Sequence, residues 1–289
     1  MKLIKPSVEI KIQGAGTDGM FEHIEWAGRH CYKSHDKATT DSAKTFVGRI
    51  ARSGHGSVLE HGTIYLGIPV EEMHAELLTN PYTKCKLVHT PAIEDWYAVT
   101  TNYRVIVENN WDMLLMHECP PTTEHEKRIT AKFVCDRGVS HEFVRSRSMS
   151  YSQESQRYCN YGKEKFGSQI TFIKPSWWNS KSADKESFKE ALLKAEETYL
   201  KAIKAWGDRK EDKRYRTKHK NNPLSPQMAR MILPNATKTE LVMTGFASDW
   251  EFFFKLRCSP AAHPDARHLA KKLKSLMIQE NLITEDNGN

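Results

Sequence analysis

The chain has 289 residues, 27% of them charged, a formal net charge of +7 and a pI near 9.0. That length suits one large domain or two small ones, and the charged fraction is ordinary for a soluble globular protein. No apolar run approaches the roughly 18 residues of a membrane span, and Lys2, Lys5 and Lys11 interrupt any secretory segment after Met1. These features exclude a membrane-spanning protein and predict a cytoplasmic one.

The cysteines and the positive charge narrow the class further. The six cysteines form no Cys-x-x-Cys pair and no zinc-like spacing, which indicates reduced thiols and no bound metal. The charge attracts anions such as nucleotides, polyglutamated cofactors or nucleic acid, but a solvated basic surface explains it equally well. The basic run Arg209–Lys220 could likewise contact nucleic acid or form a solvated loop, and a solvated loop is the stronger expectation.

Hydrophobic periodicity along the chain predicts a mixed α/β fold. Alternation with period two predicts strands at 8–12 and 63–68, and two further strands are predicted at 169–174 and 239–244. Apolar residues at helical spacing predict helices at 20–32, 39–53, 133–147, 183–206 and 264–280. Ser225-Pro226 and the capping-box spacing at Ser248–Glu251 predict two further helix starts.

Residues 70–130 follow no single period. Trp96–Val107 contains residues typical of strands, Trp111–Met116 is apolar, and Pro120-Pro121 is a break. We expect an inserted subregion of helices and a loop, whose role the residues do not indicate.

The segment 145–158 carries the clearest chemical signal. It holds three arginines and five serines within fourteen residues. Guanidinium groups are planar, permanently charged donors suited to phosphates and carbonyl-rich rings, and serines add short donors. The segment therefore predicts binding of an anionic, polar ligand such as a nucleotide, with a polar loop of a nucleic-acid-binding protein as the alternative.

This segment resembles the signature of the flavin-dependent thymidylate synthases (the ThyX family), which is Arg-His-Arg, seven residues and then Ser. Arg145, Ser146 and Arg147 are followed after seven residues by Ser155, and Arg157-Tyr158 then match as well. Three further segments resemble the family in the same order: Ser57-Val58-Leu59-Glu60-His61 with Thr63; Leu224–Arg230 with Leu233-Pro234; and Thr244-Gly245 with Trp250 and Leu256-Arg257.

The resemblance implies a ThyX-type α/β fold with a mixed sheet and long helices, as one domain over residues 1–289. The stretch at about 70–130 is longer than the family's usual connection. The implied assembly is a homotetramer with active sites between subunits. The implied reaction is reductive methylation of dUMP to dTMP, with 5,10-methylenetetrahydrofolate as one-carbon donor and NADPH as reductant through FAD.

The family pattern also implies roles for individual residues. His61, Thr63, Arg145, Ser146 and Arg147 would contact FAD, as would Gln153, Phe246 and Phe252. The dUMP ligand would be held by Glu142, Arg145, Gln153, Glu154, Ser155, Gln156, Arg157, Arg230 and Arg257. Arg157 and Arg230 would grip its phosphate. Arg257, which cannot act as a base because its pKa exceeds about 12, would stabilise negative charge on the uracil.

Several interpretations remain open. His61 could be a satisfied structural histidine, and Phe246 and Phe252 could be core residues. Ser155 could attack the uracil only with an adjacent base, so we expect it to be a donor instead. Ser146 replaces the family's His, which leaves a catalytically impaired flavin or nucleotide binder as an alternative, and a nucleic-acid-binding protein as a weaker one.

Overall fold

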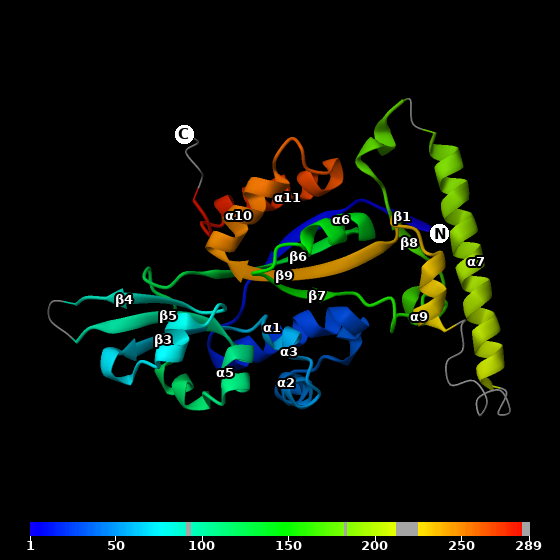
Figure 1. Ribbon diagram of the computed structural model, residues 1–289. Coiled ribbons are helices and arrows are strands. Elements are labelled where there is room, and N and C mark those ends of the chain that lie inside the picture. Colours follow the sequence, from blue (N-terminus) through cyan, green and yellow to red (C-terminus); the bar gives the residue numbers. More distant parts are fainter. Residues whose placement is uncertain (91–93, 182–183, 212–224, 285–289) are drawn as a thin grey trace.

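A computed structural model describes residues 1–90, 94–181, 184–211 and 225–284, with the backbone alone for 206–211. Most of the basic run Arg209–Lys220 lies outside the described residues. Strands and helices alternate irregularly along the chain, which confirms the predicted mixed α/β class (Figure 1). No helix in the described ranges is both long and apolar enough to cross a bilayer.

The elements have the following bounds. The strands are β1 (Lys2–Ile4), β2 (Ser7–Lys11), β3 (Thr63–Pro69), β4 (Lys84–Val88), β5 (Trp96–Asn102), β6 (Arg128–Asp136), β7 (Ser150–Gln153), β8 (Thr171–Ile173) and β9 (Lys238–Phe246). The α-helices are α1 (Gly16–Tyr32), α2 (Ser42–Arg52), α3 (Gly56–Leu59), α4 (Ala75–Thr79), α5 (Tyr103–Asn109), α6 (Arg137–Phe143), α7 (Lys185–Glu211), α9 (Pro226–Ala229), α10 (Ala247–Arg257) and α11 (Pro264–Gln279). The 3-10 turns are η1 (His35–Lys37), η2 (Val70–Glu72), η3 (Asp112–His117), η4 (Glu164–Phe166), η5 (Ser176–Asn179) and η6 (Arg230–Ile232).

The centre of the molecule is an antiparallel sheet in the order β2-β6-β9-β7. β6 and β9 pair along their whole length, from Arg128 opposite Phe246 to Asp136 opposite Lys238. Because successive side chains of a strand alternate between faces, Ile129 and Phe133 of β6 enter the same core. The sheet places the short strand β7, which carries part of the polar signature, along the edge of β9.

Helices cover both faces of this sheet (Figure 1). On one face, α6, α10 and α11 enclose a core with the fully buried Trp250, whose indole N–H donates to the carbonyl of Ile129 at 3.0 Å. On the other, α1 lies against β7 and β9, and α2 packs on α1. Gly28 permits that contact, because a Cβ there would come within 2.8 Å of Phe46 and 2.7 Å of Val58. The predicted helices at 20–32, 39–53 and 264–280 are thereby confirmed.

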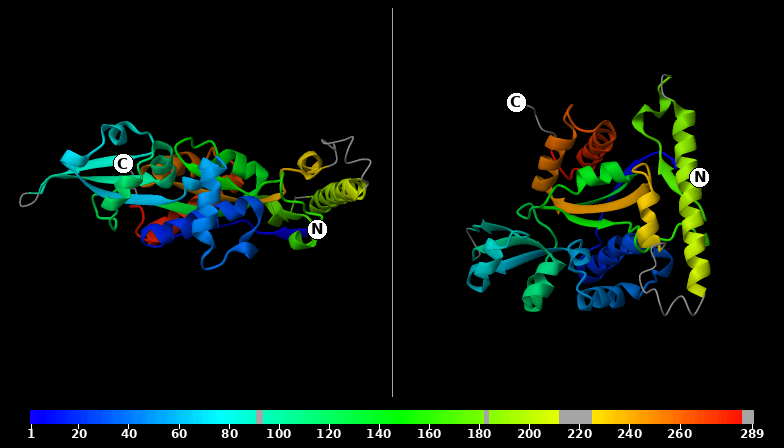
Figure 2. Two further views of the ribbon diagram at one scale, coloured as in Figure 1. Left: turned by 90° about the horizontal axis from the view of Figure 1, so that it is seen from below. Right: turned by 45° about the vertical axis from the view of Figure 1, so that its right-hand side comes forward.

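The long helix α7 forms a further layer at one end of the molecule, beside the parallel pair β1–β8 and α9 (Figure 2). Leu192, Tyr199 and Ile203 are buried against Phe172 of β8, as the helical stripe predicted. The α-amino group of Met1 pairs with Glu196 at 2.9 Å, which ties the chain's first strand to this helix.

The stretch 70–130 differs from the prediction of helices and a loop. β5 pairs with both β3 and β4, which gives a three-stranded antiparallel sheet of its own, while α5 and η3 pack beside it. The strand predicted at 63–68 is confirmed as β3. Its partner β5 is buried on both faces and mixes apolar with polar residues, so it shows no alternation and only the pairing reveals the sheet.

The helix predicted at 133–147 is wrong at both ends, because α6 spans only Arg137–Phe143. Residues 133–136 are the end of β6, held between β2 and β9, and α6 begins only at Arg137. The carboxylate of Asp136 accepts the N–H of Val139 at 2.8 Å and caps that short helix. α10 also starts one residue before the predicted cap at Ser248, with Asp249 accepting the N–H of Phe246 at 3.0 Å.

Candidate active site

The polar signature forms a loop, a short strand and a second loop around β7. Arg145 and Arg147 lie before β7, are exposed, and have no hydrogen-bond or ion-pair partner among the described residues. Ser146 between them is half-buried, and its carbonyl accepts the hydroxyl of Tyr151. Two adjacent unpaired guanidinium groups suit a diphosphate, so this loop fits the anionic part of a dinucleotide cofactor.

Two predicted uracil-side residues meet near the same end of β7. Arg257, at the end of α10, donates to a carboxylate oxygen of Glu142 on α6 at 2.6 Å and to that residue's carbonyl. The Nε of Arg257 is buried and has no partner in the described part of the chain. The guanidinium is thus fixed in position by Glu142 and keeps one N–H donor that the protein does not use.

Gln153 joins two elements behind β7. Its amide donates to Ser140 on α6 at 2.8 Å and to Thr239 on β9 at 3.3 Å. Both contacts are internal, so the amide nitrogen predicted to bind FAD and dUMP also holds β7 against its neighbours. The binding roles of Gln153 stay predictions.

Glu154 lies at the opposite end of β7 and is buried with a full set of partners. Tyr161 donates to one carboxylate oxygen at 3.0 Å, and Lys238 donates to the other at 2.8 Å. Lys238 also donates to Glu240 at 2.5 Å, and Lys33 pairs with both carboxylates. Two ammonium groups therefore neutralise two carboxylates. Glu154 is engaged in this charge network, while its predicted contact with dUMP stays a prediction.

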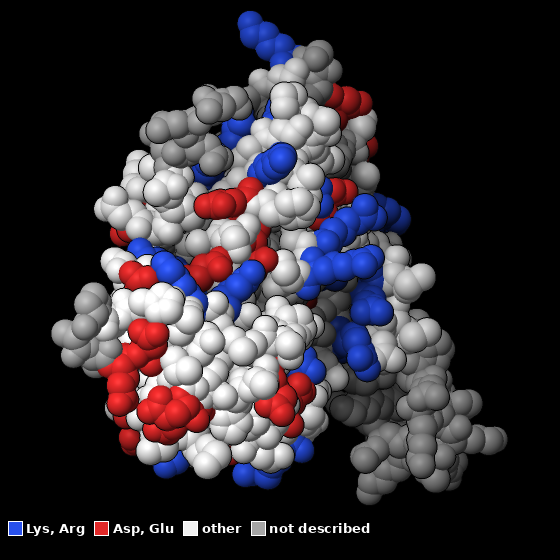
Figure 3. Space-filling model, turned by 60° about the vertical axis from the view of Figure 1, so that its left-hand side comes forward, with Lys and Arg blue, Asp and Glu red and all other residues white. Residues whose placement is uncertain are grey.

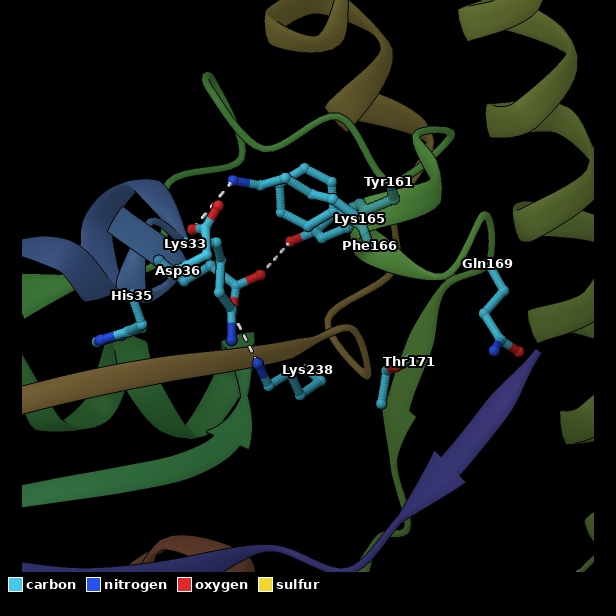
Figure 4. Close-up of a pocket in the computed structure, with 10 residues that line it drawn as sticks. Lys33, His35, Asp36, Tyr161, Lys165, Phe166, Gln169, Thr171 and Lys238 are labelled. Carbon is cyan, nitrogen blue, oxygen red and sulfur yellow. Dashed lines mark hydrogen bonds and ion pairs between the residues drawn. The ribbon is translucent and has the colours of Figure 1, made fainter. Parts of the chain in front are cut away.

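The charge network borders a pocket of about 410 Å³ (Figure 4). In the close-up, Lys238 and Tyr161 converge on the same carboxylate, and Lys165 reaches towards Asp36 across the opening. Burial opposes the charge on Glu240, yet Lys238 and Lys33 outweigh it and lower the pKa of Glu240 to about 2. Burial and the neighbouring Glu154 raise the pKa of Tyr161 well above its usual value, so Tyr161 stays a neutral donor.

The predicted phosphate-binding arginines lie just beyond this network. Arg157 is exposed and donates to Gln227 on α9 at 3.0 Å, and Arg230 is exposed at the start of η6. The backbone N–H of Ser155 donates to the carbonyl of Cys31 at 3.0 Å, and its hydroxyl accepts the N–H of Arg157 at 3.2 Å. The loop is therefore held by α1, while both arginine head groups stay available to an anion. Gln156, between Ser155 and Arg157, is half-buried.

His61 lies in a chain of buried polar side chains that crosses the sheet. Its Nδ1 is 2.8 Å from the hydroxyl of Thr244, and its Nε2 is 3.0 Å from that of Ser152. The Thr244 hydroxyl is 2.7 Å from that of Thr130, which is 3.0 Å from His23 Nε2. Burial lowers the pKa of His61 well below its usual value, so the ring is neutral. Both ring nitrogens of His61 are within hydrogen-bonding distance of protein hydroxyls. This favours the alternative that His61 is a structural histidine, while its contact with the flavin stays a prediction.

The remaining residues predicted to contact FAD are Thr63, Phe246 and Phe252, and they differ in burial. Thr63 is buried, with its backbone N–H and carbonyl held by the amide of Gln13 at 2.8 Å each. Phe246 is buried, with the cations of Arg128 and Lys84 over its ring at 5.5 and 5.7 Å, which agrees with a core role. Phe252 is 58% exposed on α10, so the core alternative is wrong for this residue.

Sequence reasoning missed several residues of the site. Lys33, Lys238 and Glu240 come from α1's end and β9, and no local pattern marks them as partners of Glu154. The hydroxyls of Thr130 and Thr244 were missed for the same reason. The one available signal is the predicted strand at 239–244, because the two-residue period of a strand extended to Lys238 places Lys238 and Glu240 on the same face.

The protein's charge and thiols complete the description. Lys and Arg side chains gather to one side of a largely uncharged lobe, on which acidic groups are scattered (Figure 3). All six cysteines are free of disulfides in the structure, and their redox state stays a prediction. The described residues include no cluster of His, Cys, Asp or Glu side chains that could hold a metal ion.

Comparison with known proteins defines the class. Residues 97–280, more than half of the chain, match the family of thymidylate synthase complementing proteins. The protein therefore belongs to this family. Among its relatives is the flavin-dependent thymidylate synthase of Mycolicibacterium vanbaalenii, which is 26% identical over 256 residues, covering 88% of this chain and 74% of the relative. A second, the flavin-dependent thymidylate synthase of Clostridium tetani, is 27% identical over 191 residues, covering 66% and 73%.

A solved structure is also similar along most of its length. It is the UMP/dUMP methylase PolB of Streptomyces cacaoi bound with 5-Br dUMP, and the match covers 96% of this chain and 93% of that one. The sequence identity is 15% and the TM-score is 0.44. At this level of similarity the structure adds nothing to the family assignment.

Proposed function

We propose that the protein is a flavin-dependent thymidylate synthase that converts dUMP to dTMP. Family membership supports this proposal, and one observation carries it to the site: exposed guanidinium groups stand before and after β7. One pair, Arg145 and Arg147, suits the diphosphate of FAD. The other, Arg157 and Arg230, suits the phosphate of a nucleotide.

The one-carbon donor would be 5,10-methylenetetrahydrofolate and the reductant NADPH. FAD, when bound, supplies hydride chemistry that no protein side chain can supply. The chain's own residues bind and orient the reactants. Arg257, held by Glu142, presents a fixed positive charge where the uracil ring becomes electron-rich before C5 accepts the one-carbon unit.

Ser155 has no general base that could activate its hydroxyl as a nucleophile in the described part of the chain. Its hydroxyl accepts a backbone N–H, and no basic side chain in the described ranges hydrogen-bonds to it. A serine needs such a base to attack C6 of the uracil. The role that fits Ser155 is therefore that of a hydrogen-bond donor to the substrate.

We infer that the complete site needs more than one subunit. Arg145 and Arg257 lie near the start of β7, whereas Arg157 and Arg230 lie beyond its end. A second copy that sets the start of one β7 beside the end of another would bring both groups of arginines to one ligand. A homotetramer in the cytoplasm, as the family resemblance implies, would supply that second copy.

The test is the absorbance spectrum of the purified protein with FAD, followed by NADPH under anaerobic conditions with and without dUMP. We expect bound flavin that bleaches at a rate dependent on dUMP, because both ligands occupy one site. Transfer of a labelled one-carbon unit from the folate to dUMP completes the test. Absence of flavin binding even at high FAD would refute the proposal and favour a nucleotide binder that lost its cofactor with Ser146.

A further inference from the structure

Two Met-His pairs that lie far apart in the sequence line one groove on the inserted part of the chain. Met73-His74 directly follow η2, and Met116-His117 end η3. The groove has a volume of about 370 Å³, and Met113 adds a third thioether to its lining. Of the described residues, none that is predicted to contact FAD or dUMP lines it. The groove is therefore separate from the site described above.

Two of these methionines are unusually exposed. Met113 is 66% exposed and Met116 is 79% exposed. They are three residues apart in η3, a 3-10 helix, in which side chains at that spacing lie one above the other. Methionine is among the residues most often buried in folded proteins. Two exposed thioethers on one side of a turn therefore indicate a role in binding and not in the core.

The histidines add nitrogen lone pairs to the same groove. Nε2 of His117 pairs with a carboxylate oxygen of Glu72 at 3.2 Å, which favours the tautomer with the proton on Nε2 and the lone pair on Nδ1. A carboxylate on the second ring nitrogen is the common support of a metal-binding histidine. The ring of His74 packs against Trp111, with the ring centroids 6.0 Å apart, and this contact orients the second imidazole.

The chemistry of these donors selects a soft metal ion. Thioether sulfur and imidazole suit Cu(I), whereas Mg²⁺ and Ca²⁺ take oxygen ligands and zinc sites use thiolate, imidazole or carboxylate. Glu71 and Glu72 border the groove and favour a cation there. No cysteine lines the groove within the described ranges. The cysteine spacing, which predicted no bound metal, therefore does not bear on this groove.

We propose that the groove between η2 and η3 binds a soft monovalent metal ion of the Cu(I) class. The ion would draw its ligands from Met73, His74, Met113, Met116 and His117. The inference goes beyond the proposed function and does not depend on it. Because the ligands come from two separate turns, a bound ion would join the turns and stabilise the folded protein.

The test is titration of the full-length protein with Ag(I), a redox-inert ion that prefers the same ligands as Cu(I). The buffer is free of chloride, and the accessible thiols are first blocked with N-ethylmaleimide. Calorimetry gives the Kd, and NMR of ¹³C-labelled methionine methyl groups identifies the sulfurs that bind. We expect shifts of the methyl signals of Met113 and Met116, and a higher Tm with Ag(I) bound.

Variants identify the ligands. Met113→Leu combined with Met116→Leu keeps the exposed apolar surface but removes both sulfur atoms, so it should abolish binding. Glu72→Gln should weaken binding about tenfold, because it weakens the support of the His117 ring. Met231→Leu is the matched control. Met231 is 85% exposed but does not line the groove, so its change should leave the Kd for Ag(I) unaltered.

Three outcomes would overturn the proposal. One is an unchanged Ag(I) affinity in the double leucine variant, which would place the ion elsewhere. Another is binding of Zn(II) in the groove as tightly as Ag(I), which would contradict the preference for a soft ion. The third is self-association that persists in the double leucine variant while the unaltered protein binds no Ag(I). That result would identify the exposed methionines as an apolar contact with a second copy. The assay contains no flavin, dUMP or folate, so its outcome is independent of the proposed function.

Discussion

Both ends of β7 carry charged groups, but the protein uses them differently. Before the strand, Arg145 and Arg147 are exposed and unpaired among the described residues. After it, Glu154 is 2% exposed and engaged by Tyr161 and Lys238. Both stretches belong to one polar signature, and sequence reasoning assigned both to ligands. The difference indicates that a buried, satisfied charge supports the fold, whereas an exposed, unsatisfied one remains available for binding.

The largest expected effect lies in the buried network. Lys238→Met should lower the free energy of unfolding by about 3–5 kcal/mol, because it leaves the buried Glu154 and Glu240 with too few partners. Urea unfolding measures this. The matched control is Lys201→Met, which breaks an exposed pair with Glu197 and should cost less than about 1 kcal/mol. Equal effects of the two changes would contradict the contrast between buried and exposed charges.

The same network predicts that the stability of the fold decreases at low pH. The pKa of Glu240 is about 2 in the folded protein against an ordinary value of 4.5, so its contribution is complete above pH 4.5 and is lost as the pH falls towards 2. A shift of this size corresponds to roughly 3 kcal/mol. Stability measured from pH 6 down to 3 should fall less steeply in Glu240→Gln than in the wild type. Parallel curves would show that Glu240 does not titrate as proposed.

At the other end of β7, the expected effects are on catalysis. Arg257→Ala should lower kcat about 100-fold or more, because it removes a preorganised positive charge from the uracil. Steady-state formation of dTMP measures this, with Lys255→Ala, an exposed residue of the same helix, as control. Glu142→Gln keeps Arg257 but weakens its anchor. If both changes alter stability and leave kcat intact, the Arg257–Glu142 pair is structural like the network around Glu154.

The buried chain through His61 should give a smaller effect on stability. Thr244→Val removes the hydroxyl between His61 and Thr130 and should cost about 1–3 kcal/mol, since it leaves buried polar groups unpaired. Thermal unfolding measures the loss. FAD affinity should change little if His61 only supports β7. A large loss of flavin binding with little loss of stability would instead support the predicted flavin contact.

The smallest effect is expected at Ser146. Ser146→His restores the family's residue between two exposed arginines and should raise FAD affinity by no more than about tenfold, the effect of one added hydrogen bond. Fluorescence titration of FAD measures it. A much larger gain, accompanied by a large gain in turnover, would identify the natural protein as a catalytically impaired member of its family.

Local patterns in the sequence determined most elements of this fold. The alternation of Ile64, Leu66 and Ile68 predicted β3, and the apolar stripe through Leu192 and Tyr199 predicted α7, because one buried face imposes a period on each. The same reasoning placed 133–136 in a helix. Phe133 fits the helical period with Val139 and Phe143 and the strand period with Ala131 and Cys135, and only pairing with β2 and β9 selects the strand.

For the site, the sequence by itself predicted the chemistry of the ligands. Three arginines among serines in 145–158 predict an anion site because guanidinium charge does not depend on the fold. Only the tertiary structure decided which charges are neutralised inside the protein. The partners of Glu154 come from β9 and from the end of α1, and those of Arg128 come from β7 and the residue before His61. Such pairings join residues far apart in the chain, and no local period records them.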